Sequence, residues 1–402
     1  MLFNYVIGNS LNNKLYHIKT DKKYLLTFGI VANLALLGYF KYADFFIENI
    51  NLLSNTDISL LHVTLPLAIS FFTFQQIAYL VDSYREETKE YDFLNYALFV
   101  TFFPQLIAGP IVHHSEMMPQ FASRWNLVKR YKNIATGLFV FSIGIFKKVI
   151  IADTFAVWAT NGFDIAQSLN MIEAWATSLS YTFQLYFDFS GYTDMAIGAA
   201  LLFNIKLPIN FNSPYKALSI QEFWRRWHIT LSRFLKEYLY IPLGGNRKGS
   251  LRTYTNLLTT FIIGGIWHGA GWGFVFWGFL HGVALVINRL WQTLGLKLPT
   301  VLAWFITFNF INITWVFFRA KEWGDAVKVL EGMFFGSLGF HIESKTLLWI
   351  ALAFLVVLAF ENSYELHKRF KLSYKNLLFT LVLLYLALEQ LSSFSEFLYF
   401  NF

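Results

Sequence analysis

The sequence predicts an all-α protein that crosses a membrane several times. Of its 402 residues, 56% are hydrophobic and only 14% are charged, whereas soluble domains carry about 25% charged residues. Aromatic residues make up 20% of the chain, and Trp and Tyr gather where helices meet the membrane–water interface. Apolar runs are spread over the whole sequence. We therefore expect one membrane domain over residues 1–402 and not several soluble domains.

Several segments are long and apolar enough to cross a bilayer, which takes about 20 mostly apolar residues in an α-helix. These segments are 24–41, 60–81, 133–152, 174–202, 299–318, 345–361 and 376–393. Two further apolar segments are interrupted: Pro104 and Gly109 break 93–112, and glycines such as Gly269 loosen 257–287. Irregular backbone at membrane depth persists only where protein or a water-filled cavity satisfies it. The interrupted segments are therefore where we expect a functional site.

Charged residues between these segments orient the chain. Lys22 and Lys23 place the N-terminus in the cytoplasm, and the basic stretches 113–132, 203–256 and 367–375 are expected there too, because cytoplasmic loops carry an excess of Lys and Arg. The region 376–402 then holds the last helix and a tail that faces outwards. We assign the net charge of +7 to these loops and not to nucleic-acid binding.

Residues 221–240 differ from a spanning segment. Trp224, Trp227 and Leu231 recur at helical spacing on one side, while Arg225 and Arg226 fall elsewhere. This pattern is typical of an amphipathic helix that lies in the plane of the membrane interface.

His268 is the histidine whose position most favours a function. It lies inside the interrupted segment 257–287. If the residues from 257 onwards are helical from the cytoplasmic face, a rise of ~1.5 Å per residue places His268 about 16 Å deep. That depth is near the middle of a hydrocarbon core about 30 Å thick. An ionisable side chain there is costly, so function is the default hypothesis.

Other buried polar residues leave alternatives open. His281 can share a site with His268 only if the glycines break the helix between them, because 13 helical steps would separate the two by ~20 Å. His228 is expected to reach inwards beneath Arg225 and Arg226. Asp188 and Asp194 interrupt an apolar run; they either relay protons or join helices through hydrogen bonds. The chain has no cysteine, which excludes disulfides and thiolate ligands, and no metal site is predicted.

Five short motifs occur in a familiar order. They are LIAGPIV at 106–112, FDFSGY at 187–192, FWRRWHI at 223–229, YIPLGGNR at 240–247 and WHG at 267–269. Together the motifs resemble the bacterial membrane-bound O-acyltransferase family, nearest to its alginate and peptidoglycan O-acetylation branch. The resemblance implies a ring of about nine to eleven transmembrane or re-entrant helices, with interfacial helices, around a central funnel.

The resemblance also implies roles for individual residues. His268 matches the catalytic histidine of the family, and His228 matches the second polar position of the reaction chamber. The C-terminal aromatic motif implies that Tyr399 carries the acyl group on the outer face, whereas composition alone makes it an interfacial anchor. Substrate contacts are expected from Trp267, and supporting contacts from His281 and Asp188.

The donor implied by the resemblance is cytoplasmic acetyl-CoA, with no permanently bound cofactor. Its phosphates need cationic contacts, which are expected from Arg225, Arg226, Arg247, Lys248 and Arg252. The implied surroundings are the bacterial inner membrane and its lipid. The implied partners are a periplasmic acetyltransferase protein and a polysaccharide acceptor.

Three other interpretations remain open. The enzyme could transfer D-alanine to teichoic acid-type polymers, or the broken helices could belong to a transporter. A membrane scaffold is the third, but a scaffold would not need an ionisable side chain such as that of His268 near the middle of the membrane. One departure from the family pattern is that its members usually begin with two more apolar segments, which places the outer helices in doubt and not the site.

Overall fold

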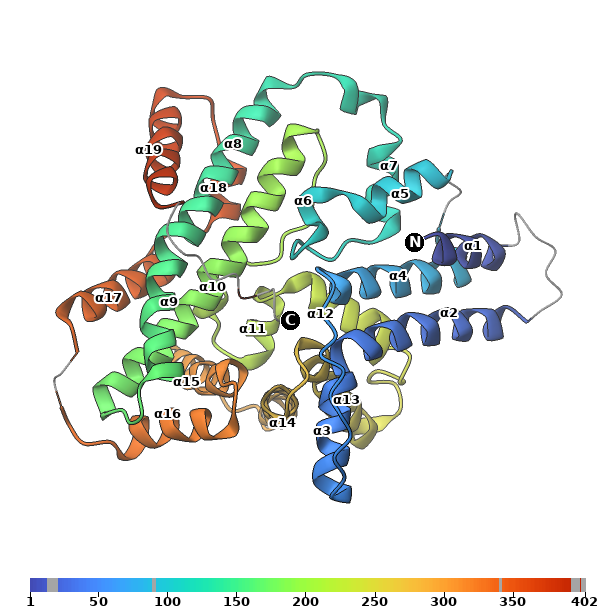
Figure 1. Ribbon diagram of the computed structural model, residues 1–402. Helices are drawn as coiled ribbons and strands as arrows, with labels where there is room; N and C mark the ends of the chain where they lie inside the picture. Colours follow the sequence, from blue (N-terminus) through green and yellow to red (C-terminus); the bar gives the residue numbers. More distant parts are fainter. Residues whose placement is uncertain (13–20, 89–91, 340–341, 392–397, 399–402) are drawn as a thin grey trace.

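The fold is described from a computed structural model, which covers residues 1–12, 21–88, 92–339, 342–391 and 398. Within these residues the secondary structure consists of helices, and no β-strand is present. This confirms the predicted all-α class. The helices surround a central region that contains α11 and α12 (Figure 1).

The first long helix extends beyond the predicted span 24–41. It runs without interruption from Lys22 to Ser54 and bends at a π-helical turn, as Figure 1 shows. Asp44 explains part of the continuation, because its carboxylate accepts hydrogen bonds from the backbone of Leu61 and His62 and so fixes the returning chain. The predicted span 60–81 becomes helical only at Ile69. The elements here are α1 (Leu2–Leu11), α2 (Lys22–Leu37), η1 (Gly38–Tyr42), α3 (Ala43–Ser54) and α4 (Ile69–Tyr84).

The segment 93–112 is broken, as predicted. Phe102 has an extended conformation just before Pro104, and the chain after Leu106 leaves the helix. The elements are α5 (Phe93–Thr101), α6 (Phe103–Leu106), α7 (His114–Phe121) and η2 (Arg124–Leu127).

The longest helical pair crosses the molecule beside the centre. One run is continuous from Tyr131 to Ile165, so the chain between the predicted spans 133–152 and 174–202 is helical in its first part. It packs against α10, and glycines let the two backbones approach closely: a Cβ on Gly144 would lie 2.6 Å from the carbonyl oxygen of Gly191. The elements are α8 (Tyr131–Phe146), η3 (Lys147–Ala152), α9 (Asp153–Thr160), η4 (Asn161–Ile165) and α10 (Met171–Leu202).

The single interfacial helix predicted at 221–240 was wrong in two respects. The helix is broken at Trp227 and His228, where His228 has a left-handed conformation (φ 42°). Its apolar side, with Trp224 and Trp227, is buried in the protein core and does not face lipid. An amphipathic pattern indicates that one face is apolar, but it does not distinguish lipid from protein as the apolar partner. The elements are η5 (Pro214–Lys216), α11 (Ile220–Arg226), α12 (Ile229–Leu235) and η6 (Lys236–Tyr240).

The interrupted segment 257–287 forms two helices, with a break at residues 269–271. Among the helices that follow α14, α16, α17 and α19 lie at the outer edge of the molecule (Figure 1). The elements are α13 (Gly249–His268), α14 (Trp272–Thr293), α15 (Thr300–Arg319), α16 (Trp323–Phe335), α17 (Ser344–Ala359), α18 (Ser363–Arg369) and α19 (Tyr374–Gln390).

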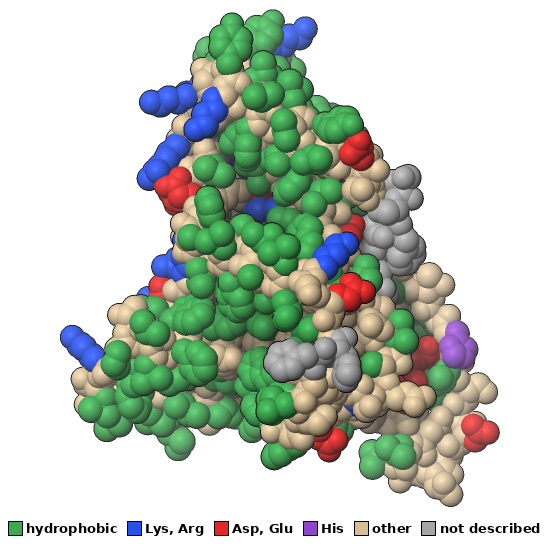
Figure 2. Space-filling view, turned by 90° about the vertical axis from the view of Figure 1, so that its left-hand side faces the viewer, with side chains coloured by type: hydrophobic (Ala, Val, Ile, Leu, Met, Phe, Trp, Pro, Cys, Tyr) green, Lys and Arg blue, Asp and Glu red, His purple; other side chains and the backbone are tan. Residues whose placement is uncertain are grey.

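Apolar side chains cover much of the outer surface, as expected for a protein in contact with lipid (Figure 2). On α19, for example, Leu377 and Leu378 are 54% and 65% exposed. In the described part of the chain, four helices are long and apolar enough to cross a membrane, or five if α17 and α18 form one bent span. The predicted nine to eleven also included re-entrant helices, so the two numbers do not count the same elements. Shorter helices such as α4 and α19, with 16 and 17 residues, are outside this count.

Candidate active site

The break between α13 and α14 presents His268 at the end of a helix. Gly269 and Gly271 are extended, so the chain turns directly from α13 into α14. A side chain at Gly269 is excluded, because a Cβ would lie 2.1 Å from the ring of Phe274. The break predicted from the glycines is therefore present, and it places His268 at its edge.

The imidazole of His268 lies in an aromatic enclosure. Its centroid is 4.8 Å from the ring of Trp267, 5.2 Å from that of Trp277 and 5.1 Å from that of Phe318, each in an edge-on arrangement. The residue is 6% exposed. Bulk water is therefore largely excluded, which strengthens electrostatic interactions inside the enclosure.

His228 lies next to this enclosure, with its ring 6.5 Å from that of Trp267. Its Nδ1 is 3.1 Å from Oδ1 of Asn210. The same Oδ1 accepts hydrogen bonds from the backbone N–H and the hydroxyl of Thr230, so it is identified as the carbonyl oxygen. In neutral His228, Nδ1 therefore donates and Nε2 is the acceptor. This Nε2 is buried without a hydrogen-bond partner among the described residues.

Trp267 joins the two histidines and offers a donor. Its ring stacks on Phe74 at 4.7 Å and contacts the edge of Phe71 at 5.5 Å. Its indole Nε1 is buried and has no hydrogen-bond partner in the described part of the chain. A buried N–H of this kind is suited to donate to a developing negative charge.

His281 has a different environment from the other two histidines. Its Nδ1 accepts from the indole of Trp224 at 3.2 Å, so its Nε2 carries the proton in the neutral form and donates to the hydroxyl of Thr314 at 3.0 Å. That hydroxyl donates in turn to the carbonyl of Ile311. Both nitrogens are occupied, and His281 joins α11, α14 and α15. It lies 4.7 Å from Trp277 and supports that wall of the enclosure.

Lys41 is a site residue that sequence reasoning missed. Its ammonium group donates to the carbonyl oxygens of Trp267 at 2.7 Å and His268 at 3.1 Å, and to the hydroxyl of Ser70 at 3.1 Å. Next to it, the hydroxyl of Tyr42 donates to the carbonyl of Ile266 at 2.6 Å. The end of α13 that carries His268 is thus capped by α2–η1. A lysine at the end of an apolar run was the available signal.

Arg225 and Arg226 lie at the end of α11, but they do not turn towards the enclosure. Arg225 is exposed, whereas His228 is 1% exposed. Arg226 forms an ion pair with Glu222 at 2.8 Å and donates to the carbonyl of Asn212 at 3.1 Å.

Asp188 and Asp194 are paired with lysines of the neighbouring helical run. Lys148 lies 2.7 Å from Asp188, and Lys147 lies 2.7 Å from Asp194. Of the two roles that the sequence left open, proton relay and the joining of helices, these contacts fit the joining of helices. Leu398, near the end of the chain, packs against the hydrophobic core to which α10 contributes.

Tyr399 lies outside the described residues, although its neighbour Leu398 is described and packs against the core. In the part of the chain that the structure covers, no three histidine or carboxylate side chains converge in a way that could hold a metal ion.

Comparison with known proteins places this geometry in a family. Residues 25–321 match the membrane-bound O-acyltransferase family. The chain is 58% identical to the peptidoglycan O-acetyltransferase of Helicobacter pylori over 362 residues, covering 83% of this chain and 68% of that protein. It is 40% identical over 379 residues to the probable alginate O-acetylase AlgI of Pseudomonas aeruginosa, covering 90% and 72%.

A more distant relative is the teichoic acid D-alanyltransferase of Streptococcus thermophilus, at 27% identity over 281 residues, which cover 63% of this chain and 68% of that protein. The family match spans well over half of the chain and includes His228, Trp267 and His268. The chain is an acyltransferase, and it belongs to the membrane-bound O-acyltransferase family.

Proposed function

We propose that this protein transfers acetyl groups across the bacterial cytoplasmic membrane for O-acetylation of a cell-envelope polysaccharide, either peptidoglycan or an alginate-like polymer. The donor is cytoplasmic acetyl-CoA. The proposal is supported by the names of the relatives at 58% and 40% identity. The observation that carries it is His268, buried in an aromatic enclosure at a helix break, with His228 and Trp267 beside it.

In the proposed reaction, His268 acts as the general base. Neutral His268 takes the proton of an acceptor hydroxyl, whose oxygen attacks the carbonyl carbon of the thioester. This attack forms the new C–O bond and a tetrahedral intermediate, which collapses as the C–S bond breaks, and His268 passes the proton to the leaving thiolate. The tetrahedral intermediate carries an oxyanion, and the indole N–H of Trp267 is the donor that the enclosure offers to it.

His228 has a separate role in this proposal. Because Asn210 holds its Nδ1 as a donor, its Nε2 presents a lone pair to the chamber. It therefore orients the acceptor hydroxyl or the thiol proton and does not stabilise the oxyanion while it is neutral.

The acceptor hydroxyl is proposed to be the phenol of Tyr399, from which a periplasmic acetyltransferase partner takes the acetyl group. Support comes from Leu398, which packs against the core to which Phe189 of α10 belongs. Phe189 in turn packs at 4.7 Å against the ring of His228. This route carries the acyl group across the membrane without its carrier.

The proposal is tested by the substitution His268→Asn in the full chain, with polysaccharide-bound acetyl measured after alkaline release. Loss of a general base costs about 10²–10⁴ in rate, so acetylation should fall to background while the protein remains in the membrane. The matched control is His62→Asn, because His62 is exposed and has a left-handed conformation that Asn tolerates. Normal acetylation by His268→Asn would remove His268 from the base role.

D-alanyl transfer is the second enzymatic candidate, favoured only by the relative at 27% identity. It would require a donor presented by a carrier protein, so the purified chain would not bind acetyl-CoA. A transporter would move its cargo without thioester cleavage. Measuring acetyl-CoA binding together with CoA release therefore distinguishes acetyl transfer, D-alanyl transfer and transport.

A further inference from the structure

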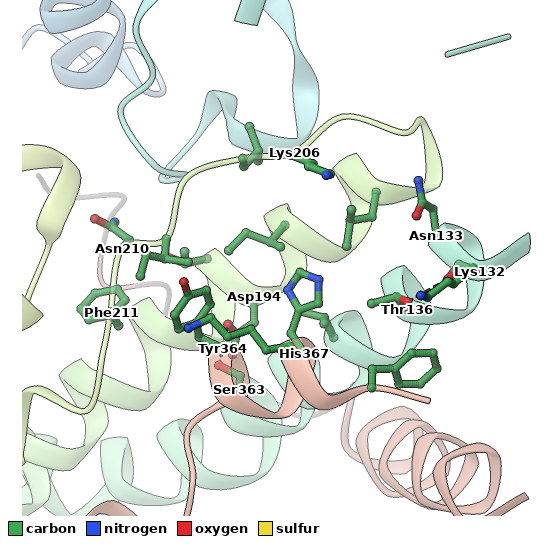
Figure 3. A pocket seen from close by; sticks show the side chains of 18 residues that line it. Lys132, Asn133, Thr136, Asp194, Lys206, Asn210, Phe211, Ser363, Tyr364 and His367 are labelled. Carbon is green, nitrogen blue, oxygen red and sulfur yellow. Dashed lines mark hydrogen bonds between the residues drawn. The ribbon is translucent and has the colours of Figure 1, made fainter. Parts of the chain in front are cut away.

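A cavity of about 380 Å³ lies where α8, α10, α18 and the chain after α10 meet (Figure 3). It is separate from the aromatic enclosure around His268. Its lining includes Lys132 and Thr136 of α8, Asp194 of α10, and His367 of α18.

The rim of this cavity is basic. Lys132, Lys206 and Lys368 line it, together with His367. Lys368 is paired with Glu365 at 3.5 Å, but Lys132 and Lys206 are exposed and have no acidic partner among the described residues. The cationic residues come from the three segments that the positive-inside rule assigns to the cytoplasm, so the structure gathers three separate basic stretches at one opening.

The floor of the cavity offers hydrogen bonds without negative charge. Nδ2 of Asn210 and the hydroxyl of Thr193 are buried, and neither has a hydrogen-bond partner within the described residues. The two side chains are 1% and 2% exposed. The acid of the cavity, Asp194, is already paired with Lys147 at 2.7 Å and accepts from the hydroxyl of Ser363 at 2.8 Å. An anionic ligand would therefore meet a neutralised acid, with two unpaired donors buried in the cavity wall.

The same floor adjoins the reaction chamber. Asn210 lines the cavity, and its Oδ1 is bonded to Nδ1 of His228. Phe211, also a lining residue, packs at 4.9 Å against Phe189, which contacts His228 at 4.7 Å. One layer of side chains thus lies between the cavity and His228.

We propose that this cavity binds the phosphate groups of the thioester donor, with Lys132 and Lys206 as the cations and Asn210 at the point where the donor passes towards His228. The inference rests on the proposed function, because it assumes a nucleotide-bearing donor. It places the phosphates away from Arg225 and Arg226, and away from the arginines and lysine at the start of α13.

The test compares the parent protein with Lys132→Gln/Lys206→Gln, each purified as the full chain in detergent. Two donors are used: acetyl-CoA and S-acetyl-pantetheine, which has the same acyl end without the nucleotide. Hydrogen bonds to charged groups are worth enough to change affinity about tenfold or more, so the Kd and KM for acetyl-CoA should rise about tenfold. S-acetyl-pantetheine should bind both proteins equally, and Lys132→Arg/Lys206→Arg should restore acetyl-CoA binding.

The matched control is Lys129→Gln/Lys371→Gln, which removes the same charge from two of the same basic stretches at exposed residues that do not line the cavity. An equal loss of affinity in this control would mean general attraction, and would overturn the inference. Weakening by Arg247→Gln/Arg252→Gln, with no effect at the cavity, would also overturn it. If the parent binds no acetyl-CoA at all, the proposed donor fails and the inference fails with it.

An anionic lipid headgroup carries the same chemistry as the donor phosphate. Protein in nanodiscs of phosphatidylcholine, with and without phosphatidylglycerol, distinguishes the two sources. If Lys132→Gln/Lys206→Gln lowers only the amount of co-purified phosphatidylglycerol and leaves acetyl-CoA binding unchanged, the cavity holds a lipid phosphate and the inference is wrong.

Discussion

At the scale of single residues, Lys41 shows how a charge can organise the site without entering the chemistry. Its ammonium group satisfies two carbonyl oxygens at the end of α13, those of Trp267 and His268. The last carbonyls of a helix have no partner within the helix, and a cation there also interacts favourably with the helix dipole. Lys41 therefore fixes the backbone from which His268 projects.

Replacing Lys41 by Met should weaken both stability and catalysis. Met has a similar length and an apolar end, so the two carbonyl oxygens and the hydroxyl of Ser70 would remain buried without this donor. Each unsatisfied buried group costs about 1–3 kcal/mol. We expect a lower unfolding temperature in detergent and a fall in kcat that exceeds the change in KM, because His268 would be less well held and the donor site would be intact.

The conservative change Lys41→Arg provides the control, since it retains a cationic donor. It should recover part of kcat. If Lys41→Met lowered stability while kcat in the remaining folded protein stayed at the parent value, Lys41 would be a structural cap with no positioning role.

The buried position of His268 at a helix break was predictable, whereas its surroundings were not. His268 lies in an apolar run among glycines, and both depth and the irregular backbone are local properties of the sequence. Lys41 is 227 residues away from His268 along the chain, and the pairing of Asn210 with His228 depends on a loop that follows another helix. Such contacts are set by tertiary packing, which a single sequence does not reveal.

At the scale of elements, α8 and α10 are held together by paired glycines. Gly137 faces Gly198, and Gly144 faces Gly191, with a Cβ on any of these four lying 2.6–2.8 Å from the carbonyl oxygen of its partner. Small residues at helix interfaces let backbones approach closely in membrane proteins. The close approach also brings Lys147 and Lys148 to the two aspartates of α10.

The substitution Gly144→Ala should therefore separate α8 from α10. The new Cβ would lie 2.6 Å from two backbone atoms, the oxygen of Gly191 and the nitrogen of Met195. These atoms can shift only if the backbone of α10 shifts with them. Overpacking typically costs about 1–3 kcal/mol. We expect a clear fall in the unfolding temperature in detergent.

The control for this change is Gly324→Ala in α16, where a Cβ has no neighbour within 4 Å. Alanine in a helix is favoured over glycine by roughly 0.5–1 kcal/mol, so this variant should be unchanged or slightly more stable. A loss of stability of equal size in both variants would contradict the close-packing account.

The length of an apolar run predicted which segments are helical, but it did not predict whether the apolar face of a helix contacts lipid or protein. The runs at 174–202 and 299–318 match α10 and α15 closely, because long apolar periods leave few alternatives. The region 221–240 was misplaced, since Trp224 and Trp227 bury the same apolar face in protein that they would bury in lipid. The break at His228 was missed because hydrogen bonds from the chain around Asn210 replace helical ones there.

At the scale of the whole molecule, the helical run from Tyr131 to Ile165 connects two different cavities. The basic cavity lies at its start, and a second cavity of about 850 Å³ lies towards its end, with Asp153, Glu173 and Glu343 in the lining. At ~1.5 Å per residue, 35 residues span about 50 Å, which exceeds a hydrocarbon core of about 30 Å. The run is therefore long enough to place its two ends on opposite sides of a membrane.

The orientation of this run can be measured directly, because the chain contains no cysteine and needs no background substitutions. We predict that Lys129→Cys, just before α8, is cytoplasmic, since cytoplasmic loops carry the excess of basic residues. Ser168→Cys, just after the run, should lie outside. Both positions are exposed. In intact spheroplasts, a membrane-impermeant maleimide should label Ser168→Cys and leave Lys129→Cys unmodified, and lysis should make both reactive. The reverse pattern would place the basic cavity on the outer face, where no cytoplasmic thioester could reach it.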